Sequence, residues 1–109
     1  MLLDPKWNKQ LVESKTVETL KRGRARVELC WCPFGGVDAY GGVCPSVAIT
    51  EQFSLEEMVR ELPPALDFFR QAICGGAIPD WNDTPGRTKA EVLAAFERAI
   101  ELARREEET

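Results

Sequence analysis

The sequence contains no histidine. This absence excludes Ser-His-Asp triads, Cys-His dyads and every zinc site that includes a histidine ligand. The chain also has no phosphate-binding loop of specific pattern, and it has no run of the roughly 20 apolar residues that a membrane span requires. We therefore expect no enzymatic activity. A reaction that uses carboxylates alone, such as Glu57 or Asp83, ranks far below a binding role.

We also expect no signal peptide, because Asp4 and Pro5 in MLLDPKWNKQ stand where one would need a long apolar run. We expect a cytoplasmic protein whose four cysteines are reduced rather than paired in disulfides. The length of 109 residues predicts one domain, residues 1–109, with enough apolar side chains for a single core. The formal charge of −4 disfavours nucleic acid as a partner, and the basic run at 21–26 is typical of a solvated helix or loop face.

Two adjoining helices are indicated in the middle of the chain. The first is predicted over 54–62, where Ser54 and Glu57 form a capping box and a proline pair follows. The second is predicted over 64–74, because a proline suits its first turn and a glycine pair stands just after its last residue. Both helices are predicted from the residues that start and end them.

A third helix is predicted over 88–106, starting with a capping box of Thr88 and Glu91. Its acidic end, 106–109, lies at the negative end of the helix dipole and should fray. The sequence therefore predicts a mainly α fold, a small single-domain helical protein. The expected core consists of Leu66, Phe68, Phe69, Ile73, Phe96 and Ile100.

The first half of the chain has a less regular pattern. Residues 1–23 can form a helix that Gly23 ends. Strict alternation of apolar and polar residues over 24–31 indicates a strand, and the glycines that follow can turn the chain back toward 43–49. We therefore expect a short β-hairpin or an irregular Cys- and Gly-rich turn at 24–49, although Pro45 can equally open a short helix there.

The cysteines allow two interpretations. Cys30 and Cys32 would point to the same side of a strand, and Cys44 and Cys74 could complete a four-thiolate site for zinc or an iron–sulfur cluster. The paired C-x2-C elements of zinc ribbons are missing, and free cysteine is commonly a buried, structural residue. We expect structural thiols with no metal and no other cofactor, and we keep the metal site as the alternative.

The segment IPDWNDTPGRT also allows two interpretations. Trp81 between two prolines, followed by capping residues, is typical of a loop that fixes the angle between two helices. The alternative is a recognition surface built by Trp81, Asn82, Asp83 and Arg87, because binding residues gather on rigidly held loops.

A second candidate contact surface lies in the Gly-rich stretch. Trp31, Phe34 and Tyr40 belong to a segment too short to bury all its apolar side chains. Exposed aromatic residues are the usual anchors of protein contacts, so we expect Phe34 and Tyr40 at the surface.

Two motifs resemble those of a family of small uncharacterised proteins from actinobacteria and their phages. The first is W-C-x-x-G at Trp31–Gly35, and the second is W-N-D-x-P-G-R-T-x-x-E-V-L, which begins at Trp81. The resemblance is strongest over 78–102. It implies a mostly helical fold and an actinobacterial or phage setting, which would be the host cytoplasm for a phage protein. The family is a domain of unknown function, so the resemblance implies no catalytic residue.

These observations predict a non-catalytic protein-interaction domain, for example a small phage or accessory factor that binds a host protein. The alternative is a cysteine-ligated metal or redox-linked regulator. The expected partner is a protein, and self-association into a homo-oligomer is compatible with the sequence. No membrane partner is expected.

Overall fold

The computed structural model describes residues 14–33 and 39–108. These two stretches form helices and turns, and neither of them contains a strand. The predicted mainly α fold is therefore confirmed. The predicted helix over 1–23 lies outside the described residues up to Glu13. In chain order the described helices are α2 (Lys15–Leu29), α3 (Pro45–Thr50), α4 (Leu55–Arg60), α5 (Pro64–Ala72), α6 (Ile78–Asn82) and α7 (Lys89–Glu108).

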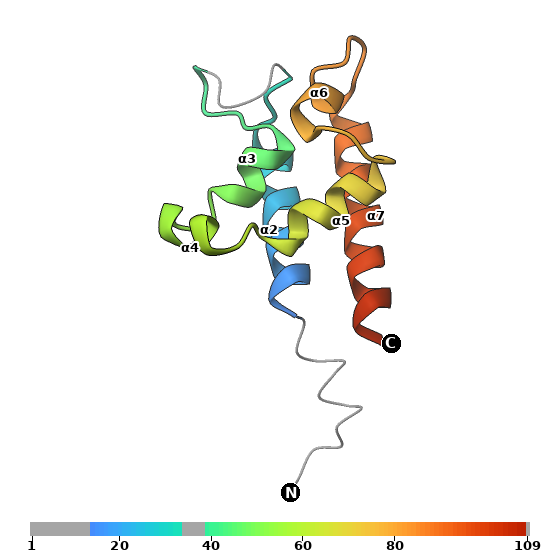
Figure 1. The fold of residues 1–109 in the computed structure, drawn as a ribbon. Helices are drawn as coiled ribbons and strands as arrows, with labels where there is room; N and C mark the ends of the chain where they lie inside the picture. The colour runs from blue at the N-terminus through green and yellow to red at the C-terminus, as the bar shows by residue number, and fades with distance from the viewer. Residues whose placement is uncertain (1–13, 34–38, 109) are drawn as a thin grey trace, which may run out of the picture.

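The two longest helices, α2 and α7, lie side by side and run in opposite directions (Figure 1). Helix α5 packs against both of them, and α3 packs against α2 and α5. Helix α4 projects from the side of this body, and α6 lies near the start of α7 (Figure 1). Among the described helices, none combines the length and the hydropathy needed to cross a membrane.

The strand predicted over 24–31 is wrong, because α2 continues through this stretch to Leu29. Two of the alternating apolar residues, Ala25 and Leu29, are exposed, so the alternation does not mark a buried face. The buried positions instead recur every three or four residues, which is the period of a helix. They are Val17, Thr19, Leu20, Gly23 and Val27.

The sequence predicted that Gly23 ends a helix, but Gly23 lies inside α2 and faces Phe96 of α7 and Ile49 of α3. A Cβ atom on Gly23 would stand 3.0 Å from Cε1 of Phe96 and 3.4 Å from Cγ1 of Ile49. The helix starts after Ser14, whose side chain accepts a hydrogen bond from the Val17 backbone N–H at 3.1 Å, and Gly23 lacks the positive φ of a glycine that ends a helix. The glycine therefore serves packing rather than termination.

The hairpin predicted at 24–49 is also wrong. Two hydrogen bonds join the chain after α2 to the chain before α3: Cys32 N–H donates to Val43 O at 3.0 Å, and Val43 N–H donates to Cys30 O at 3.1 Å. They produce one isolated parallel bridge, between Trp31 and Val43, and no ladder of strands. The chain then enters α3 at Pro45, which confirms the helical alternative for this position.

The predicted start and stop signals are confirmed for α4 and for the beginning of α5. In α4, Ser54 and Glu57 form the reciprocal capping box, with bonds of 2.9 and 3.1 Å. The helix ends at Arg60, ahead of the proline pair, and Pro64 occupies the first turn of α5.

The end of α5 comes two residues earlier than predicted, at Ala72. The first left-handed residue of the closing turn is Cys74, with φ of 66°, and the two glycines that follow it also have positive φ, 91° and 89°. Gly75 N–H donates to Arg70 O at 2.7 Å and Cys74 N–H donates to Gln71 O at 3.1 Å, the bonding pattern of a Schellman motif. Cysteine thus occupies a position at which glycine is favoured.

The core lies between α2, α5 and α7, where Phe69 and Phe96 meet edge to face with their ring centroids 4.8 Å apart. Five of the six predicted core residues are buried, whereas Phe68 is only partly covered. Within the Gly-rich stretch, Val43 is fully buried, and Trp31 packs against the core. Helix α7 continues to Glu108, beyond the predicted end at 106.

The close approach at Gly23 predicts a steric effect of a larger side chain there. Gly23→Leu should lower the free energy of unfolding by about 1–3 kcal/mol, because the new side chain must displace Phe96 and Ile49. Ala25→Leu is the matched control, since Ala25 lies in the same helix and is exposed. Urea denaturation followed by circular dichroism measures both variants. Equal midpoints for the two would contradict the packing described here.

Candidate functional site

The segment predicted as a recognition loop contains a fully buried polar side chain, Asn82. Its Oδ1 atom accepts a hydrogen bond from Trp31 Nε1 at 2.8 Å, and its Nδ2 atom donates to Cys32 O at 2.9 Å. Asn82 ends the short helix α6, which has Pro79 in its first turn. The buried amide therefore connects α6 to the chain that follows α2, and it is not available to an external partner.

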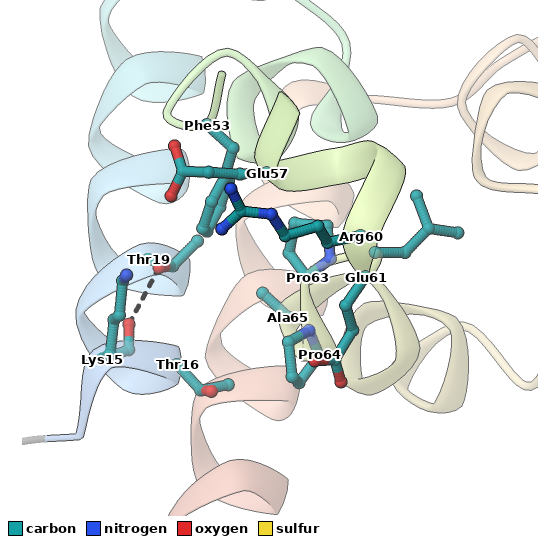
Figure 2. A pocket seen from close by; sticks show the side chains of 11 residues that line it. Lys15, Thr16, Thr19, Phe53, Glu57, Arg60, Glu61, Pro63, Pro64 and Ala65 are labelled. Carbon is teal, nitrogen blue, oxygen red and sulfur yellow. Dashed lines mark hydrogen bonds between the residues drawn. The ribbon is translucent and has the colours of Figure 1, made fainter. Parts of the chain in front are cut away.

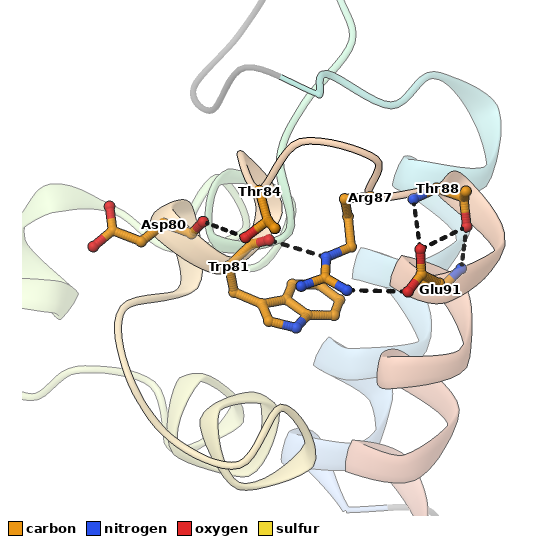
Figure 3. Close-up of polar contacts among 6 residues, drawn as sticks. All are labelled: Asp80, Trp81, Thr84, Arg87, Thr88 and Glu91. Atoms are coloured by element: carbon orange, nitrogen blue, oxygen red, sulfur yellow. Dashed lines mark hydrogen bonds and ion pairs between the residues drawn. The ribbon is translucent and has the colours of Figure 1, made fainter.

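Trp81 makes three contacts, one with Phe69 and two with Arg87. Its ring packs edge-on against Phe69, with centroids 5.8 Å apart and planes at 78°. The Arg87 guanidinium lies 4.0 Å from the centre of the indole ring (Figure 3). Arg87 Nε also donates a hydrogen bond to the Trp81 carbonyl at 3.0 Å. Arg87 therefore makes a cation–π contact with the Trp81 ring and also closes the loop through its hydrogen bond to the Trp81 backbone.

Arg87 joins this loop to the first turn of α7. Its terminal nitrogen lies 3.0 Å from Glu91 Oε2, while Glu91 Oε1 accepts a hydrogen bond from the Thr88 backbone N–H at 2.9 Å (Figure 3). The Thr88 backbone bond, the Thr88 hydroxyl and Arg87 together hold the pKa of Glu91 below its ordinary value. The carboxylate is therefore charged at neutral pH, at the positive end of the helix dipole.

The geometry favours the interpretation of 78–88 as a structural connection. Trp81, Asn82 and Arg87 all make internal contacts, whereas Asp83 is exposed and lies 3.4 Å from Asn82 Nδ2. Thr84 Oγ1 donates to Asp80 O at 3.1 Å and closes the turn (Figure 3). We refer to the contacts of Trp81, Asn82, Arg87 and Glu91 as the Trp81 network.

The four cysteines are not brought together. Cys32 and Cys44 are buried, Cys30 is half-buried and Cys74 is exposed. Cys44 Sγ lies 3.1 Å from the Ser46 hydroxyl. Over residues 14–33 and 39–108, no three cysteine or carboxylate side chains are placed so that they could hold a metal ion. The structure therefore gives no support to the four-thiolate alternative.

The predicted aromatic surface divides into three parts. Tyr40 is 92% exposed, whereas Trp31 is half-buried and donates to Asn82. Phe34 lies outside the described residues. Tyr40 thus remains a candidate contact residue, and Trp31 has a structural role.

The sequence analysis missed an apolar surface on α4. Leu55 is 75% exposed, Val59 79% and Leu62 58%, and no residue of α4 is buried. Leu55 and Val59 belong to α4, and Leu62 lies two residues beyond its last residue; we call these three residues the α4 stripe. Their spacing of four and three positions, in a helix predicted to pack into the core, was the available signal. This spacing alone does not show whether the apolar face of the helix is buried or exposed.

A groove of about 350 Å³ lies beside the α4 stripe, between the start of α2 and the α4–α5 connection (Figure 2). Leu62 belongs to both the stripe and the groove lining. Lys15 Nζ lies 5.9 Å from the centre of the Phe53 ring, and Glu57, Arg60 and Glu61 also line the groove. Hydrogen bonds from Ser54, first its backbone N–H and then its hydroxyl, hold the pKa of Glu57 below its ordinary value. The lining therefore contains two carboxylates and two cations.

The buried amide predicts a large effect of its removal. Asn82→Ala should lower the free energy of unfolding by about 2–4 kcal/mol, because the Trp31 indole N–H and the Cys32 carbonyl both lose a partner. In a double-mutant cycle with Trp31→Phe, the combined loss should be smaller than the sum of the single losses. Denaturant titration of the four proteins measures the coupling, with Asp83→Ala as the exposed control. Strict additivity would mean that the two side chains do not interact.

The lowered pKa of Glu91 predicts a pH-dependent contribution to stability. The stability that the Glu91 carboxylate contributes should be fully present above pH 4.5, which is the ordinary pKa of the group. It should disappear as the pH falls through the lowered pKa of the folded protein. Glu91→Gln keeps an amide oxygen for the cap and removes the charge, so it should be less stable than wild type near neutral pH and equally stable in acid. Thermal melts across this pH range measure the difference, and Glu101→Gln controls for the loss of one charge from α7. A difference independent of pH would contradict the assignment.

Comparison with known proteins identifies one relationship. Residues 12–102 match a family described as a family of unknown function, DUF6197. No curated protein and no solved structure matches the chain. The family match covers α2 to α6 entirely and most of α7. The chain therefore belongs to the family of unknown function DUF6197.

Proposed function

We propose that this protein is a non-catalytic protein-interaction domain. The observation that carries the proposal is the α4 stripe, since Leu55 and Val59 of α4 and Leu62 just beyond it are exposed, while every other described helix contributes to the core. Grouped exposed apolar residues are typical of protein contact surfaces. Leu29 is also exposed, by 80%, but it belongs to a helix that buries Val17, Leu20 and Val27 in the core.

The titratable groups of the two candidate sites support a role without catalysis. General acid–base catalysis works best with a pKa near the working pH. Glu57 and Glu91 have pKa values held below the ordinary value by capping hydrogen bonds, so they are poor general bases. The chain has no histidine to take that role. The Trp81 network uses its polar groups in internal bonds.

The biological setting belongs to the same proposal. Motifs at Trp31–Gly35 and from Trp81 onward resemble those of actinobacterial and phage proteins, and membership of DUF6197 is compatible with that origin. We place the protein in the cytoplasm, or in the host cytoplasm if a phage encodes it, as an accessory factor that binds a host protein. Tyr40 would add an aromatic contact at a second position on the surface.

Site-specific photocrosslinking tests the proposal. A photoreactive phenylalanine analogue at position 59 should give a discrete adduct with one other protein in cells that carry the gene. The same analogue at Ala90, an exposed position on α7, should not give this adduct. Adding Leu55→Ser to the position-59 protein should weaken the adduct, because the α4 stripe is then less apolar. If position 59 gives no more adduct than position 90, α4 is not a contact surface and the proposal is wrong.

A further inference from the structure

The α4 stripe has the geometry of a helix-binding surface. Leu55 and Val59 lie one turn apart on α4, and Leu62 is an exposed residue of the extended link that follows the helix. The stripe continues into the neighbouring groove, because Leu62 belongs to both. An apolar stripe beside a groove suits the apolar face of a partner helix, whose own side chains recur every three or four positions.

The charges beside this stripe favour a basic partner. Glu56, Glu57 and Glu61 stand on α4 and at its end, and Arg60 is the one basic residue of residues 54–62. Arg60 is paired with Glu56 at 2.9 Å, so its charge is already compensated within the helix. Glu57 and Glu61 line the groove, where Lys15 of α2 is the other cation. Three carboxylates, Glu56, Glu57 and Glu61, thus stand against two cations, Arg60 and Lys15, which leaves a net charge of −1 beside the apolar side chains.

A second copy of this chain is a poor occupant for the same reason. Two α4 stripes facing each other would bring two sets of glutamates together, and each chain has a formal charge of −4. Like charges across an interface disfavour association. An anionic membrane surface would be repelled in the same way.

We propose that the α4 stripe and its groove bind an amphipathic helix of another protein, with apolar residues every three or four positions and lysine or arginine beside them. This inference rests on the proposed function and specifies the chemistry of the partner. The partner's apolar residues cover the α4 stripe, and its cations face Glu57 and Glu61 across the groove. Binding should therefore weaken as salt screens these charges.

Two labelled model peptides of about 18 residues provide the test. Both carry the same leucine row, and one has lysine flanks where the other has glutamate flanks. Fluorescence anisotropy with the full-length protein should show the lysine peptide binding at least about tenfold more tightly. The Leu55→Ser, Val59→Ser double variant should lose at least about tenfold in affinity for the lysine peptide. Leu29→Ser, which removes an exposed leucine outside the stripe, is the matched control and should bind as wild type does.

The possible outcomes separate the inference from the function on which it rests. Equal binding of both peptides, or of neither, overturns the inference, whereas the position-59 adduct would still support an interaction domain. Sedimentation equilibrium showing a dimer that Val59→Ser abolishes would assign the surface to a second copy instead. Tighter peptide binding by a full-length Trp7→Ser variant would assign it to this chain's own first residues. Either result overturns the inference, and circular dichroism melts verify that each variant is folded.

Discussion

A buried amide at Asn82 constrains the path of the chain at one end of the molecule. An amide removed from water must keep hydrogen-bond partners, since each unpaired buried polar group costs about 1–3 kcal/mol. Asn82 finds them in the Trp31 indole and the Cys32 carbonyl, 51 and 50 residues earlier in the chain. The exit of α2 and the position of α6 are therefore determined together. Trp81, the neighbouring residue, then packs on Phe69 of α5, and Arg87 continues the connection to α7.

This constraint also divides the molecule into structural and available surfaces. The most distinctive stretch of the sequence, WNDTPGRT, uses its aromatic, amide and guanidinium groups for internal contacts. A distinctive motif can thus mark a fold rather than a binding site. The opposite holds for α4, whose sequence looks ordinary and whose apolar residues are left outside the core. The candidate contact surface is found by asking which apolar side chains the fold leaves uncovered.

Local signals in the sequence determined what could be predicted. Capping boxes at Ser54 and Thr88 and the proline pair before α5 depend on neighbouring residues, and all three are present in the structure. The strand prediction failed because eight residues of alternation cannot compete with helical spacing that begins earlier, at Val17. The role of Gly23 depends on Phe96, far along the chain, and the burial of Asn82 depends on Trp31. No pattern within a short window contains such information.

The exposure of the α4 stripe raises the question of what keeps this helix formed. An isolated helix of its six residues would be unstable in water. Helix nucleation is unfavourable in free energy, and so short a helix forms too few backbone hydrogen bonds to offset it. The capping box satisfies the backbone donors at the start, and the proline pair fixes where the helix stops. The Glu56–Arg60 pair adds a small contribution on the solvent side. Local signals therefore hold α4 in helical form without burying its apolar side chains, and a preorganised surface loses less entropy when a partner binds.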